Sequence, residues 1–219
     1  FDSMHIGSFV IENGEAAISG EDSADLLVQV PQINLNWNDI RIDSSLAASG
    51  KTIESGDVTF ALQNIHGHLP GALYSFSVPS LSVNSKNSLV TIDSILLNPA
   101  VDKKKFGQLA GYQTDCITLK VSDIHAYSGR LQELIEKQVV YVDSLEAGAL
   151  MLSAYRDKNI PRKPKTQELP VMLLKKLPFQ LTILKTTVHR ADVTYEELAE
   201  GASQSGHITF NKVEATALH

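Results

Sequence analysis

The stretch Phe76–Val83 (FSVPSLSV) holds two apolar-x-apolar pairs that are separated by two residues instead of one. Alternation of apolar and polar residues predicts β-strands with one buried face. The two-residue step shifts this alternation, so the strand must either carry a bulge or turn its apolar side to the opposite face of the sheet. A sheet that is built from such strands must bend.

The same shifted alternation recurs along nearly the whole chain. Further copies lie at Val28–Leu35, Val90–Leu97, Leu119–Ala126, Val140–Ala147 and Ile208–Ala215, with looser copies at Phe60–Ile65 and Leu181–Val188. Their uneven spacing argues against a solenoid of fixed period. The pattern predicts a mainly β fold: a curved, twisted antiparallel sheet, groove-like or sandwich-like, of roughly nine to eleven strands with two or three short helices.

Prolines and turn residues sharpen this prediction. Pro31 and Pro79 both lie at the shift in alternation, and proline cannot donate a ladder hydrogen bond, so the shift is predicted to be a bulge. Asn13-Gly14 predicts a hairpin turn within residues 6–20. Residues 102–110 are predicted to form a basic turn or a short helix, and short helices are predicted at 129–138 and 170–177.

The chain divides by composition into three parts. Residues 1–155 are predicted to form the main curved sheet. Residues 156–169 are rich in proline and basic residues and are predicted to be an exposed connector. Residues 170–219 are predicted to form a short helix and strands that continue the same sheet or start the next unit.

Composition excludes several classes of protein. A net charge of −6 over 219 residues argues against a dedicated nucleic-acid binder. Cys116 is the single cysteine, so no disulfide can form within the chain and no cysteine-rich metal site is possible. No segment approaches the ~20 apolar residues of a membrane span. Because the sequence opens without Met and ends within the strand pattern, we expect an internal piece of a longer protein.

Few residues suggest chemistry. His66 and His68 could share a face of a strand and bind a metal, but no third ligand is evident, and an exposed turn is the simpler expectation. Asp192 and Glu196-Glu197 could form a carboxylate pair, although a capping box or a charged strand end fits better.

Cys116 could be a nucleophile with His125 as its base, but it is more typical of a small buried strand residue. The run Lys103–Lys105 could touch phosphates or lipid headgroups, although a solvated turn is the usual meaning of such a run. Trp37 continues an apolar phase and could belong to the core or to a ligand surface. No nucleophile elbow, phosphate loop or zinc-protease motif is present, so we predict no catalysis, no metal and no cofactor.

Several stretches resemble large envelope proteins of Bacteroidetes that belong to the AsmA-like superfamily. The resemblance covers most of the chain from about residue 25 and is carried by Tyr74–Val83, Leu96–Pro99, Tyr155–Lys158, Leu177–Ile183, Ala191–Glu197 and Gly206–Thr216. It implies a long curved β-groove in the bacterial envelope, periplasmic and usually anchored in a membrane at its N-terminus, that moves or organises lipids or takes part in outer-membrane biogenesis. The family offers no catalytic residues.

We therefore expect a non-enzymatic segment whose apolar inner face shields phospholipid or another acyl lipid. Candidate groove residues are Leu81, Val83, Ile95 and Leu97. The alternative is a secreted or surface β-sandwich module that binds protein or glycan, with the same residues closed into a core. Exposure of these residues separates the two hypotheses.

Overall fold

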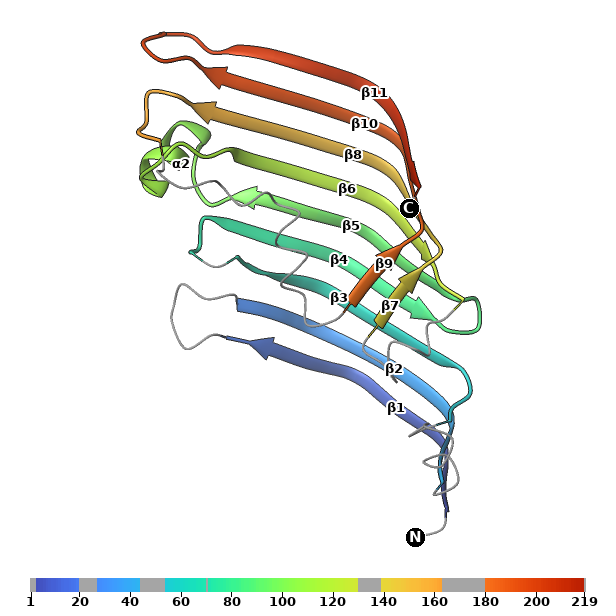
Figure 1. Cartoon of the computed structure of the whole chain (residues 1–219). Coiled ribbons are helices and arrows are strands. Elements are labelled where there is room, and N and C mark those ends of the chain that lie inside the picture. The colour runs from blue at the N-terminus through green and yellow to red at the C-terminus, as the bar shows by residue number, and fades with distance from the viewer. Residues whose placement is uncertain are drawn as a thin grey trace.

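The computed structural model describes residues 3–19, 27–43, 54–69, 71–129, 139–162 and 180–218. Its main feature is one large, open, curved sheet (Figure 1). The elements are β1 (Ser3–Ile18), β2 (Leu27–Asp43), β3 (Val58–His68), β4 (Tyr74–Asn84), β5 (Leu89–Pro99), α2 (Lys103–Ala110), β6 (Cys116–Tyr127), β7 (Val139–Val142), β8 (Ser144–Asp157), β9 (Gln180–Ile183), β10 (Lys185–Leu198) and β11 (Gly206–Leu218). The predicted mainly β fold is confirmed.

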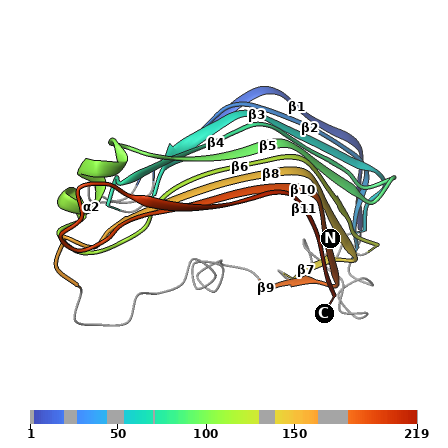
Figure 2. The same ribbon diagram turned by 90° about the horizontal axis from the view of Figure 1, so that it is seen from above.

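Nine strands form the sheet in the order β1-β2-β3-β4-β5-β6-β8-β10-β11. Neighbouring strands are antiparallel except β8 and β10, which are parallel. β7 and β9 form a separate parallel pair. Only Asp143 lies between β7 and β8, and only Leu184 between β9 and β10. The small pair therefore leaves the end of β8 and β10 and turns away from the plane of the sheet (Figure 2).

A bend line crosses the sheet where the alternation shifts in the sequence. The ladder pairs are interrupted there, between Gln29 and Gln32 on β2 and between Ser77 and Leu81 on β4. Pro31 and Pro79 therefore lie outside regular pairing, as predicted. On four other strands, a residue at the bend line has a left-handed backbone with φ of 54° to 57°: Asn13, Asn64, Asp123 and Lys212.

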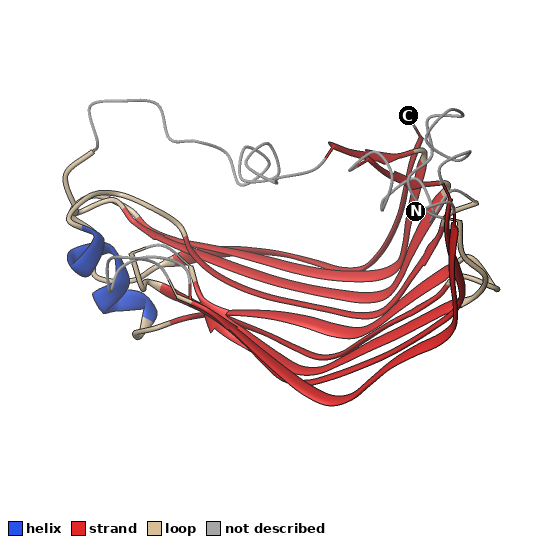
Figure 3. Cartoon of the chain, turned by 90° about the horizontal axis from the view of Figure 1, so that it is seen from below, coloured by secondary structure: helices blue, strands red, loops and turns tan. Residues whose placement is uncertain are grey.

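The bend gives the sheet a concave and a convex face (Figures 2 and 3). Four apolar side chains beside the bend line are buried: Ile65, Ile124, Ala147 and Ala191. Among the polar residues at the bend, Asn64, Asp93 and Asp123 are exposed, whereas Ser94 is buried. Because no second layer covers the described sheet here, this contrast shows that the apolar residues lie in the inside corner. The apolar side thus stays on the concave face through the bend, as a bulge requires and a face switch does not.

α2 covers one end of the sheet on its convex side (Figure 2). Asp102 caps it by accepting a hydrogen bond from the Lys104 N–H at 2.9 Å, and Gly111 ends it with φ of 76°. Phe106 packs on Cys116 and Tyr155, and the three form the most buried cluster of the described residues. Of the two structures predicted for residues 102–110, a basic turn or a short helix, the helix is the one that forms.

Two sequence-based predictions were wrong. Asn13-Gly14 makes no hairpin turn, because β1 runs through it and pairs with β2 on both sides; Asn13 forms the bulge of the bend line instead. The connector does not begin at Arg156, because β8 extends to Asp157 and Arg156 pairs with Glu197 of β10. The predicted helices at 129–138 and 170–177, and most of the connector, lie outside the described residues.

The segment after the connector is joined to the same sheet. β10 pairs with β8 over its whole length, and β11 adds the last strand. In the described part of the chain, no helix has the length and apolar character to cross a membrane.

Candidate functional site: the apolar concave face

Apolar side chains from many strands line the concave face in rows that follow the ladder. On the α2 side of the bend, one row consists of Phe76, Leu97, Leu119, Leu152, Val193 and Phe210. On the other side, one row consists of Leu62, Leu81, Ile92, Ile124, Ala147 and Val188, and the next of Leu35, Phe60, Val83, Val90, Ala126 and Leu145. Successive rows of apolar side chains make a continuous surface across the sheet.

The four candidate residues belong to this surface but not to one spot. Leu81 and Val83 lie on β4 beyond the bend line, whereas Ile95 and Leu97 lie on β5 on the α2 side of it. All four are half-buried. Most of the row members were not singled out from the sequence. Their alternation was visible, but which strand neighbours which is decided only by the fold.

Apart from the short β7–β9 pair, no described element lies against the concave face. Most of its aliphatic side chains are half-buried by their neighbours in the same layer and remain in contact with solvent. In a sandwich they would be sealed by a facing sheet at about 10 Å. β7 and β9 lie on this side near one end of the sheet (Figure 3). The described structure is therefore an open trough.

A charged group ends the apolar surface at the α2 end. The Arg156 guanidinium donates to both carboxylate oxygens of Asp115, at 2.7 and 2.5 Å. Lys158 Nζ lies 2.7 Å from Glu197 Oε1, and the Tyr195 hydroxyl donates to Glu197 Oε2 at 2.8 Å. The hydrogen bond with Asp115 raises the pKa of Arg156, and the bonds from Lys158 and Tyr195 lower the pKa of Glu197. Both shifts favour the charged forms of Arg156 and Glu197.

The opposite face at the same end is sealed by α2. Cys116 and Tyr155 are each 5% exposed beneath Phe106. Burial raises the pKa of the Cys116 thiol to about 11 and that of the Tyr74 hydroxyl to about 12. Cys116 is therefore a buried strand residue, as predicted, and is protonated at neutral pH, which does not suit a nucleophile.

The histidine pair does not form a turn. His66 and His68 lie in β3 and pair with β2 and β4. The His66 ring nitrogens lie 2.7 Å from the Asn64 carbonyl oxygen and 2.8 Å from Gln29 Oε1. Among the residues that the structure describes, no three His, Cys, Asp or Glu side chains come together as a metal site would need.

The acidic pair at the end of β10 is divided between the two faces. Glu196 pairs with Lys103 at 2.5 Å on the side that α2 covers, whereas Glu197 pairs with Lys158 on the other. The predicted charged strand end is confirmed. Asp192 lies further along β10 and accepts a hydrogen bond from the Lys212 N–H at 2.8 Å. Lys103–Lys105 form the first turn of α2 rather than a loop.

Trp37 lies on β2 in the apolar phase of Leu35. It is half-buried, and its Nε1 is buried with no hydrogen-bond partner among the residues that the structure describes. A buried indole N–H without a partner costs free energy, which an apolar side chain would not.

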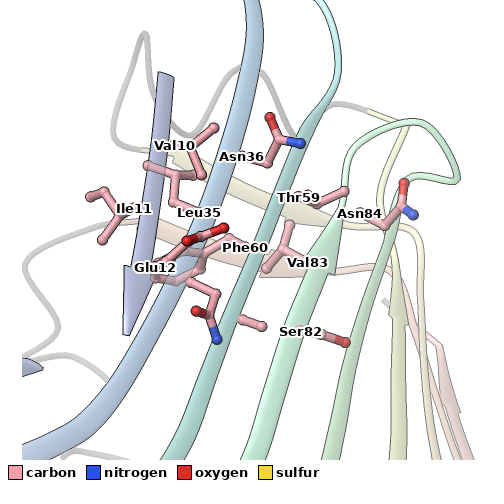
Figure 4. A pocket seen from close by; sticks show the side chains of 12 residues that line it. Val10, Ile11, Glu12, Leu35, Asn36, Thr59, Phe60, Ser82, Val83 and Asn84 are labelled. Carbon is pink, nitrogen blue, oxygen red and sulfur yellow. The ribbon is translucent and has the colours of Figure 1, made fainter. Parts of the chain in front are cut away.

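A shallow hollow of about 500 Å³ lies over β1–β4 (Figure 4). Each strand lines it with three successive residues. The first and third of each triplet lie on the face opposite to the row of Leu35, Phe60 and Val83. The hollow therefore lies on the convex face of the sheet, opposite to the apolar concave face. Its polar side chains are Glu12, Asn34, Asn36, Thr59, Ser82 and Asn84. They can donate and accept hydrogen bonds but offer no nucleophile paired with a base.

Comparisons of this chain with protein-family models, with curated proteins and with solved structures each gave no match.

Proposed function

We propose that this chain is a non-enzymatic segment of an AsmA-like envelope protein of bacteria, and that its concave face holds acyl chains of lipids. The observation that carries the proposal is the continuous, half-buried apolar surface without a second layer in the described residues. A single-layer sheet with one apolar face exposes more hydrophobic area than soluble monomers normally leave uncovered. An acyl chain can cover such an area without needing specific polar groups.

The free energy gained by burying an acyl chain is of the size that this role requires. Each buried methylene contributes about 0.8 kcal/mol, so about ten of them contribute roughly 8 kcal/mol before ordering costs. Micromolar affinity requires a net binding free energy of about 8 kcal/mol, so the ordering cost must be offset by burial of further methylenes. An apolar surface that crosses nine strands offers room for several chains.

The resemblance to AsmA-like envelope proteins supports a location in the bacterial envelope. We propose that the parent protein is periplasmic, is anchored in a membrane, and takes part in lipid transport or outer-membrane biogenesis. Such a role needs no metal, cofactor or catalytic residue.

The test is native mass spectrometry of the protein purified from cells, followed by solvent extraction of whatever is bound. We expect phospholipid or another acyl lipid at a defined stoichiometry. Protein that carries no lipid, and that also fails to take up a fluorescent fatty acid in solution, would contradict the proposal.

A second candidate is a module that binds glycan or protein, and the polar hollow over β1–β4 is the observation that favours it. Its amide, hydroxyl and carboxylate groups suit sugar hydroxyls. The substitutions Asn36→Ala and Ser82→Ala would weaken glycan binding and leave lipid uptake unchanged, so the two functions can be tested separately.

A further inference from the structure

The concave face changes from apolar to charged along three adjacent strands. Leu119, Leu152 and Val193 form one row across β6, β8 and β10. The next row toward α2 is Ile117, Ala154 and Tyr195. Two residues further along each strand, the same face carries Asp115, Arg156 and Glu197, because side chains alternate with a period of two. An apolar surface thus passes through a tyrosine to a row of charges.

This order matches the structure of an amphipathic lipid. Tyrosine suits the boundary between an apolar and a wet region because its ring is apolar and its hydroxyl is polar. The Tyr195 hydroxyl points to the charged end, since it donates to Glu197. In the opposite direction along β8, apolar residues continue from Leu152 past the bend to Leu145.

The length of the apolar surface also fits. Leu152 lies seven positions after Leu145 on β8. Since a strand rises about 3.3 Å per residue, this surface is roughly 20 Å long. The hydrocarbon core of a bilayer is about 30 Å thick, so one leaflet contributes about 15 Å. One acyl chain of a membrane lipid can lie along the strands between the charged row and the far side of the bend.

The charges in the row are balanced. Arg156 and Lys158 carry two positive charges, and Asp115 and Glu197 carry two negative charges. A purely anionic headgroup that bound the two cations would leave both carboxylates without their partners, which is costly for partly buried groups. A zwitterionic headgroup replaces both partners at once.

We infer that the groove binds a zwitterionic phospholipid in one orientation, with its acyl chain along β6 and β8 and its headgroup on this charged row. The phosphate contacts Lys158 and Arg156, and the ammonium group contacts Glu197 and Asp115. This inference rests on the proposed function, because it assumes that the concave face binds acyl lipid.

The chain supplies a matched control. Glu196 and Glu197 are neighbours on β10 and point to opposite faces, each paired with a lysine. Lys158→Gln removes a positive charge beside the groove, whereas Lys103→Gln removes one from the face that α2 covers. Lys158→Gln is expected to weaken binding of phosphatidylethanolamine about tenfold, as loss of one charged hydrogen bond would. Lys103→Gln is expected to leave binding unchanged.

Orientation can be measured by tryptophan quenching. In a Trp37→Phe background, the variants Leu152→Trp and Leu145→Trp each carry one tryptophan, at opposite ends of the apolar surface of β8. The probes are phosphatidylethanolamines with bromine near the carbonyl or near the methyl end of the chain. Bromine near the carbonyl should quench the Leu152→Trp variant more strongly, and bromine near the methyl end should quench the Leu145→Trp variant more strongly. Circular dichroism checks that each variant is folded.

The outcomes separate the two claims. If wild-type protein takes up no acyl lipid, the proposed function fails and this inference fails with it. If the wild type takes up lipid, any one of three results overturns only this inference. The first is that phosphatidylglycerol and diacylglycerol bind as tightly as phosphatidylethanolamine. The other two are that Lys158→Gln has no more effect than Lys103→Gln, or that both tryptophans respond alike to both probes.

Discussion

The two faces of the sheet at the α2 end obey the same alternation but differ in what covers them. Under α2, Phe106 is 1% exposed, and Cys116 and Tyr155 are each 5% exposed. On the concave face of the same strands, Leu119 and Leu152 are only half-buried. The difference teaches that alternation marks which side is apolar, whereas a second layer decides whether that side becomes a core or a surface for a ligand.

The largest effect on stability is expected at the covered face. Phe106→Ala removes the ring that fills the space between Cys116, Tyr155 and Tyr74, so it should lower the free energy of unfolding by about 3 kcal/mol or more. Urea denaturation followed by circular dichroism measures this loss. A loss below about 1 kcal/mol would mean that α2 does not seal this face.

A smaller loss of stability is expected on the same covered face when the pH is raised. Burial raises the pKa of the Cys116 thiol from 9.0 to about 11, so the folded state favours the protonated thiol. This contribution is complete below pH 9 and is lost as the pH rises through 11, amounting to at most about 2.7 kcal/mol for two pKa units.

Urea denaturation of wild type and of Cys116→Ala at pH 8 and pH 10.5 measures the difference. We expect wild type to lose more stability over this interval than the variant. Equal losses would indicate that the thiol is accessible to water.

A substitution at the bend line tests whether the bend depends on the left-handed backbone of Asn64. Asn64 has φ of 57°, which β-branched residues adopt only with strain. Asn64→Val should therefore destabilise the fold by about 1 to 2 kcal/mol, whereas Asn64→Gly should be nearly neutral. Thermal unfolding of the two variants provides the comparison, and equal stability would show that the bend does not depend on this conformation.

Much of the fold could be predicted from the sequence, because alternation is a local signal. Most copies of the shifted alternation lie within single strands of the sheet, and the shift at Phe76–Val83 correctly indicated a bulge at Pro79. The shift after Val142 coincides with the break at Asp143 between β7 and β8. A second shift, within β8 between Ala147 and Leu150, was missed although the same spacing marks it.

The errors arose where the meaning of a local signal depends on the neighbouring strand. Asn-Gly favours a tight turn, but it also tolerates the left-handed backbone of a bulge. Beside a partner as long as β2, the chain of β1 continues and Asn13 takes the bulge. The charged row at Arg156 was missed for a similar reason, because Asp115 and Glu197 join it only through the order of β6, β8 and β10.

The smallest effect is expected at the histidine pair. His66→Ala with His68→Ala should change the free energy of unfolding by no more than about 0.5 kcal/mol, because both side chains are exposed on β3. Lipid uptake should also be unchanged. Zinc or iron that co-purifies at one ion per chain and is lost in the double variant would contradict this expectation.

The central claim, that the concave face is open and holds acyl chains, is tested most directly by placing a charge on each face of β4. Leu81 lies on the concave face and Ser82 on the opposite face. Uptake of a fluorescent fatty acid is measured for Leu81→Glu and Ser82→Glu, with the fold checked by circular dichroism. We expect both variants to fold and only Leu81→Glu to lose binding. Unfolding of Leu81→Glu together with no uptake by the wild type would instead show that this face is closed as a core.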